Sequence, residues 1–109
     1  MKQGEIYWYP FPAPDKRRPV LILTRTSALR FLSSVTVAPI TTTIRGIPTE
    51  VVLGPQDGLA TDCAVNLDNI QTIQKARLGA FIATLATEKM QAVKQAIHFA
   101  LGMDECASY

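Results

Sequence analysis

The chain has 109 residues, of which 48% are hydrophobic and 18% are charged, and its formal net charge is +2. These values exclude a disordered chain and predict one domain over residues 1–109, large enough to bury a core without a metal or a disulfide. No apolar run approaches the roughly 18–20 residues that span a bilayer, so we expect no membrane partner. Residues 1–5 lead into a proline-broken segment and resemble no signal peptide, and we therefore expect the protein in the cytoplasm.

Short runs rich in β-branched and aromatic residues, bounded by proline and glycine, predict a series of strands. These runs cover residues 4–11, 19–25, 33–43, 49–53, 63–73 and 78–83. A turn at residues 45–48 separates the third run from the fourth, so these two strands are expected to form a hairpin. A single helical turn with Ser27 as its N-cap is expected between the second strand and the third.

The last part of the chain has the apolar spacing of a helix. Thr87 is the expected N-cap, Met90 and Val93 begin the apolar face, and Gly102 ends the pattern. Residues 103–109 are expected to form a disordered tail. Several short strands with one closing helix predict a mostly β fold, a small antiparallel barrel on which the C-terminal helix docks.

The segment at residues 15–23 places three cations directly before a wholly apolar run. Lys16, Arg17 and Arg18 precede Pro19 and a stretch that is typical of a buried strand. Because proline restricts the preceding residue, Arg18 is expected to be extended, at the mouth of a core strand that holds its guanidinium in place. The alternative is that these cations form a solvated loop that keeps a sheet edge soluble.

The charges are unevenly distributed along the chain. Residues 1–49 carry seven cations and two anions, a net charge of +5, whereas residues 50–109 carry four cations and seven anions, a net charge of −3. Six of the first-half cations lie between residues 16 and 45. This asymmetry predicts that one face of the protein binds a polyanion through its phosphate groups.

The residues present exclude several kinds of catalytic centre. Cys63 and Cys106 follow no ligand spacing and are expected to be free thiols, and the single histidine, His98, lies in a helical pattern near the C-terminus, so a catalytic Cys–His pair is not expected. No cluster of side chains has metal-ligand spacing, so neither a metal nor another cofactor is expected. What remains is Arg18, the hydroxyl run at residues 41–43, and Asp68 in an otherwise apolar strand. Guanidinium and hydroxyl groups stabilise negative charge on phosphorus, so they favour phosphodiester chemistry.

Four sequence segments follow one another in a recognisable order. They are Gly-Glu-Ile-Tyr at 4–7, Arg-Pro-Val-Leu-Ile-Leu at 18–23, Val-Ala-Pro-Ile-Thr-Thr at 37–42 followed by Pro-Thr-Glu-Val-Val-Leu at 48–53, and Asn-Leu-Asp-Asn-Ile-Gln-Thr-Ile at 66–73 with Arg-Leu at 77–78. In these segments the chain resembles the MazF/PemK family of toxin endoribonucleases. Each motif is short, but the four together occur in the family's order.

The resemblance implies an SH3-like antiparallel barrel of the CcdB/MazF/PemK type that forms a homodimer. It implies metal-independent cleavage of single-stranded RNA, in which the 2′-OH attacks and leaves a 2′,3′-cyclic phosphate and a 5′-OH. It also implies a cognate acidic antitoxin that covers the RNA-binding groove. By position in the motifs, Arg18 and Thr41 match the family's catalytic arginine and threonine. Further RNA-binding residues are expected at Lys16, Arg17, Arg25, Thr42, Asp68 and Gln71.

Other functions and roles remain open at this point. The same barrel could serve a non-catalytic poison of the CcdB type that traps DNA gyrase, or a plain nucleic-acid-binding module. Thr41 could be an ordinary strand residue, and Asp68 could cap a bulge or pair with Arg77. Trp8 could belong to the core or to a dimer interface instead of stacking on a base.

Overall fold

The structure of the protein is a computed structural model that describes residues 1–14 and 16–103. Apart from Met103, the predicted disordered tail at residues 103–109 lies outside the described residues. The strands are β1 (Glu5–Pro10), β2 (Arg17–Ile22), β3 (Ser34–Thr41), β4 (Glu50–Leu53), β5 (Cys63–Asn66), β6 (Gln71–Gln74) and β7 (Phe81–Thr84). The helices are α1 (Thr26–Leu29), α2 (Thr87–Ala100) and three 3₁₀ turns, η1 (Pro55–Asp57), η2 (Leu67–Asn69) and η3 (Lys75–Arg77).

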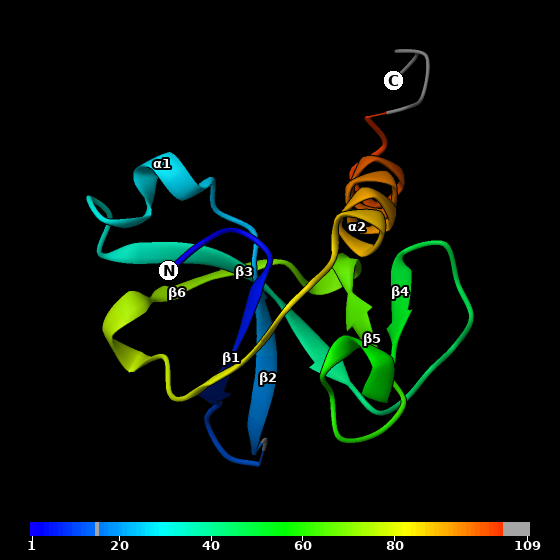
Figure 1. Cartoon of the computed structure of the whole chain (residues 1–109), viewed down its shortest axis with the longest axis horizontal. Helices are drawn as coiled ribbons and strands as arrows, with labels where there is room; N and C mark the ends of the chain where they lie inside the picture. The colour runs from blue at the N-terminus through cyan, green and yellow to red at the C-terminus, as the bar shows by residue number, and fades with distance from the viewer. Residues whose placement is uncertain (15, 104–109) are drawn as a thin grey trace.

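All strand pairs are antiparallel, and the sheet order is β4-β5-β3-β2-β1-β7, with β6 also paired to β3. The long strand β3 crosses between the two halves of the molecule, pairing first with β2 and β6 and then with β5 (Figure 1). The sheet therefore curls into a half-barrel with α2 against β4 and η2. This arrangement confirms the predicted mostly β fold with a C-terminal helix.

Two buried clusters lie on either face of β2, because alternate residues of a strand point to opposite sides. One contains Ile6, Leu21 and Val65 and is closed by Val93 of α2. The other contains Val20 and is formed mainly by β2, β3 and β6. The apolar run that was predicted to be a buried strand is therefore buried on both faces, and it anchors the cations that precede it. None of the helices in the described part of the chain has the length and hydrophobicity of a membrane span.

Several local predictions are wrong. The strands on either side of residues 45–48 form no hairpin, because β4 pairs with β5 instead of β3. Ser27 is not the N-cap of α1, because α1 begins at Thr26 and its N-cap is Arg25. Thr87 is not the N-cap of α2, because Ala86 takes that position. Neither helix has a side-chain cap hydrogen bond. The single strand predicted at 63–73 is broken by η2 into β5 and β6.

Two glycines with positive φ allow a matched test of the loop that η1 forms. A Cβ at Gly58 (φ 92°) would lie 2.7 Å from the Cβ of Ala83, whereas a Cβ at Gly46 (φ 69°) would have no atom within 4 Å. Gly46→Ala should lower the free energy of unfolding by about 1–2 kcal/mol, the cost of the left-handed conformation alone. Gly58→Ala should cost about 1–3 kcal/mol more, because the loop must also move away from β7. Urea denaturation measures both losses, and equal losses would show that Gly58 is not tightly packed.

Candidate active site

The candidate site lies where β2 and β3 separate. Their pairing ends at Val20 opposite Pro39, and the next residue of β2 in that direction, Pro19, also lacks an N–H to continue the ladder. If the register continued, Arg18 would face Thr41 across the sheet. The pairing stops before that point, and Thr41 pairs only with Ala64 of β5, on the other edge of β3. The two strands therefore diverge, and Arg18 and Thr41 lie across the space between them.

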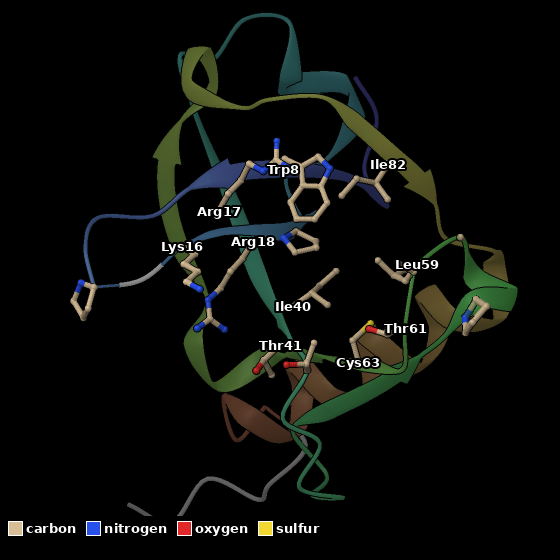
Figure 2. Close-up of a pocket in the computed structure, with 16 residues that line it drawn as sticks. Trp8, Lys16, Arg17, Arg18, Ile40, Thr41, Leu59, Thr61, Cys63 and Ile82 are labelled. Atoms are coloured by element: carbon tan, nitrogen blue, oxygen red, sulfur yellow. The ribbon is translucent and has the colours of Figure 1, made fainter.

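This space is a cavity of about 770 Å³ with two contrasting walls. Figure 2 shows Lys16 and Arg18 on one side and the apolar side chains of Leu59 and Ile82 on the other. Ile82 is the extra residue of a β-bulge between β1 and β7, and bulges commonly redirect a side chain into a site. The full lining is Trp8, Pro14, Lys16, Arg17, Arg18, Pro19, Ile40, Thr41, Thr42, Pro55, Gly58, Leu59, Ala60, Thr61, Cys63 and Ile82.

Trp8 forms part of this cavity together with Arg17. The register of β1 and β2 puts the two side chains on the same face, and the guanidinium carbon of Arg17 lies 4.4 Å from the centre of the Trp8 ring system. The backbone of Trp8 is held by Gly79, whose N–H donates to the Trp8 carbonyl at 2.7 Å. The site thus offers a fixed aromatic surface with a cation stacked on it, whereas the neighbouring Tyr9 belongs to the buried core.

A second, smaller cavity of about 250 Å³ adjoins the first. Among the described residues, Arg18 and Thr41 alone line both cavities, so these two side chains form the wall between them. Both are partly buried. The Oγ1 of Thr41 accepts a hydrogen bond from the N–H of Thr43 at 3.1 Å, which orients the hydroxyl and leaves its proton for another acceptor. The pair can therefore contact one phosphate group from two sides.

Five of the eight predicted site residues meet in the larger cavity: Lys16, Arg17, Arg18, Thr41 and Thr42. The other three line neither cavity. Arg25 is exposed at the N-cap of α1, Asp68 accepts a hydrogen bond from the Thr49 hydroxyl at 2.6 Å, and Gln71 donates to the Asn69 carbonyl at 3.4 Å. The hydrogen bond from Thr49 is a structural role for Asp68 that the sequence did not indicate. RNA contacts by these three residues remain predictions.

Sequence reasoning missed the polar residues of the smaller cavity. Arg45, Glu50, Asn66 and Asn69 line it together with Phe11. Asn66 and Asn69 lie in the same sequence block as Asp68, and this closeness in sequence was the signal that could have indicated them. The side-chain directions in that block depend on η2, and a strand pattern does not reveal such a turn.

Cys63 also lines the larger cavity, but its chemistry does not suit a nucleophile. The thiol is free and buried, and burial raises its pKa, with the charges of Asp57 and Asp62 adding to the effect. Because the thiolate is the reactive form, a raised pKa makes the thiol less reactive at neutral pH. Within residues 1–14 and 16–103, no group of three or more His, Cys, Asp or Glu residues is arranged to hold a metal ion.

Comparisons with known proteins agree on the kind of protein this chain is similar to. Residues 2–101 match the family described as PemK-like, MazF-like toxin of type II toxin–antitoxin system. The chain is 47% identical over 90 residues to endoribonuclease MazF3 of Mycobacterium tuberculosis, covering 83% of this chain and 87% of that protein. It is 40% identical over 100 residues to probable endoribonuclease MazF5 of the same species, with 91% of each covered.

Solved structures show the same likeness. The Mycobacterium tuberculosis toxin MazF-mt6 has a TM-score of 0.85 at 43% identity, over 92% of this chain and 98% of that one. A mycobacterial endoribonuclease solved in complex with its cognate antitoxin also has a TM-score of 0.85, at 31% identity over 97% and 99% of the two chains. The fold is therefore shared over nearly the full length of both proteins.

The raised pKa of Cys63 predicts that its thiol is alkylated slowly at neutral pH. In a Cys106→Ser background, which leaves Cys63 as the single cysteine, alkylation of the native protein by iodoacetamide at pH 7 should be much slower than alkylation of the urea-unfolded protein. The native rate should begin to rise only at a pH above the usual thiol range. Mass spectrometry follows the modification, and a native rate equal to the unfolded rate would contradict the burial and the raised pKa.

Proposed function

The chain belongs to the PemK-like, MazF-like toxins of type II toxin–antitoxin systems, and we propose that it cleaves single-stranded RNA at a phosphate held between Arg18 and Thr41. It is an endoribonuclease of this family, as the resemblance of its sequence segments predicted. The observation that supports the site is the shared wall, in which these two residues face both cavities. A strand of RNA that occupies both cavities would pass its backbone over this pair.

The proposed reaction uses the substrate's own nucleophile. The 2′-oxygen forms a bond to phosphorus, and the bond from phosphorus to the 5′-oxygen breaks, which gives a 2′,3′-cyclic phosphate and a 5′-OH. Arg18 and the hydroxyl of Thr41 bind the phosphate oxygens as negative charge builds up on them, and such electrostatic stabilisation is usually the largest contribution to catalysis. The 2′-OH releases its proton to water. Arg18 passes a proton to the leaving oxygen and is reprotonated from water, since its guanidinium stays charged at neutral pH.

The remaining cations of the larger cavity bind and orient the RNA. Lys16 and Arg17 are exposed at its rim, where they can neutralise backbone phosphates, and Thr42 adds a hydroxyl donor. The stacked pair of Trp8 and Arg17 provides a surface for an unpaired base. No metal ion is required by this arrangement.

The same positive charge explains the proposed partners. An acidic antitoxin with an extended segment would neutralise the cations around Arg18 and exclude RNA, and one structural neighbour was solved with its cognate antitoxin. We further propose that the chain acts as a homodimer in the cytoplasm, with RNA bound in a groove at the interface. The gyrase-poison and simple binding functions are not favoured, because relatives up to 47% identical are named endoribonucleases.

The role of Arg18 predicts a loss of cleavage without a loss of fold. Arg18→Ala should slow cleavage of a random-sequence RNA pool about 100- to 1,000-fold. Arg18→Lys should recover little of this rate, because lysine cannot bind phosphate in a bidentate manner. Arg30→Ala is the matched control, since Arg30 is exposed beside α1 and lines neither cavity. Sequencing of cleaved ends and thermal denaturation measure activity and folding, and full activity of Arg18→Ala would refute the assignment.

The use of the substrate's 2′-OH predicts that a single 2′-deoxy nucleotide on the 5′ side of the cut abolishes cleavage at that bond. Cleavage of the all-RNA substrate should survive EDTA. Thr41→Ala should lower kcat more than it changes KM, by about 1–3 kcal/mol for one lost transition-state hydrogen bond. Thr41→Ser keeps the hydroxyl and should retain most of the activity. Continued cleavage of the 2′-deoxy substrate would show that water is the nucleophile instead.

A further inference from the structure

The smaller cavity has the chemical composition of a site for one unpaired nucleobase. Single-stranded RNA is recognised by aromatic rings that stack on bases and by polar groups that bind their edges. Here Phe11 supplies a ring, held edge-on by Tyr9 with the ring centres 4.9 Å apart. Asn66, Asn69 and Glu50 supply polar groups. The volume of about 250 Å³ is below the roughly 300–1,000 Å³ of pockets for drug-sized ligands, so a single base is the appropriate occupant.

The position of this cavity connects it to the cut. It shares Arg18 and Thr41 with the larger cavity, so a base held in it belongs to a nucleotide next to the scissile phosphate. The larger cavity offers the stacking surface of Trp8 and the apolar Leu59 and Ile82, and stacking tolerates every base. Edge-binding groups gather in the smaller cavity, and these groups can discriminate among bases.

We propose that the smaller cavity reads the base of one nucleotide adjoining the cut, and that Glu50 makes it select a base with an exocyclic amine. This inference rests on the proposed RNA-cleaving function. Adenine, cytosine and guanine carry an exocyclic amine that donates hydrogen bonds, whereas uracil carries none, and its single ring donor, N3–H, lies between two carbonyl oxygens. A carboxylate accepts hydrogen bonds and donates none when ionised. Glu50 therefore attracts an amine and repels a carbonyl.

The hydrogen bonds of Glu50 leave one oxygen for this role. Its Oε1 accepts from the backbone N–H of Arg45 at 2.9 Å and of Gly46 at 3.1 Å. These bonds hold both the carboxylate and the loop that follows Thr43. Among hydrogen bonds within the described residues, none uses the second oxygen, Oε2. This oxygen is the expected acceptor for the amine.

The two asparagines complete the set of edge-binding groups. The Oδ1 of Asn66 accepts from the N–H of Asp68 at 3.0 Å, so its amide nitrogen can donate to a ring nitrogen or carbonyl of the base. Asn69 is exposed at the end of η2 with its side chain lining the cavity. The cavity thus presents a fixed acceptor beside amide donors, and the one edge donor of uracil, its ring N3–H, can reach this acceptor only with a carbonyl oxygen on either side of it.

The test compares Glu50→Gln with the wild-type protein on a random-sequence RNA pool, with cleaved ends sequenced. Gln keeps a carbonyl oxygen for the two backbone N–H groups but replaces Oε2 with an NH₂ donor. Wild type should prefer amine-bearing bases over uracil at one position adjoining the cut, about 10-fold or more. Glu50→Gln should lose or reverse this preference at that position only. Asn69→Ala should weaken the same preference, whereas Glu88→Gln, on the exposed start of α2, should leave it unchanged.

Each outcome decides the proposal. Unchanged base preference in a folded Glu50→Gln overturns it, and if thermal denaturation shows that Glu50→Gln does not fold, unchanged preference in Asn69→Ala overturns it. Wild-type cleavage with no preference at either adjoining position also overturns it, while the proposed RNA-cleaving function stands. If wild type cuts none of the pool, the proposed function itself fails and the base-reading site is lost with it.

Discussion

The separation of β2 from β3 after Val20 and Pro39 is the constraint on which both cavities depend. Pro19 removes the backbone donor of β2 at the point where the ladder with β3 would continue. β3 continues with β5 paired along its other edge, and the gap beside β2 is lined by the last residues of the two strands that separate. The site is therefore a product of the sheet itself and does not depend on a long flexible loop.

The buried part of β2 fixes the backbone from which Arg18 enters this opening. Val20, Leu21 and Ile22 are completely buried, and they fix the backbone only two residues beyond Arg18. A guanidinium on such a strand has a long side chain but a rigid starting point. Preorganised charge is more effective than mobile charge, because little reorganisation is needed when the transition state forms. The uneven distribution of charge along the sequence thus becomes a local concentration of cations around one cavity.

Some of these features could be predicted from the sequence, and others could not. The position of Arg18 could be predicted because it depends on neighbours: three cations, one proline and an apolar run. The β3–β4 hairpin could not be judged in that way, since a turn at residues 45–48 is compatible with several partners and β5 provides the pairing. Asn66 and Asn69 stood in a recognised motif but were given no role, because the directions of their side chains depend on η2. Local patterns thus predicted the strand ends, while the contacts between distant strands decided what those ends face.

The wall shared by the two cavities has a consequence for how substrate choice is expressed. Arg18 and Thr41 line both cavities. If RNA is cut as proposed, a nucleotide that fits one cavity and not the other would still bind through stacking and phosphate contacts, yet it would leave the reacting phosphate out of line with the pair. Poor substrates would then act as competitive inhibitors that occupy the site without being cut. Cellular RNA lacking the preferred sequence would then act as a buffer for the toxin.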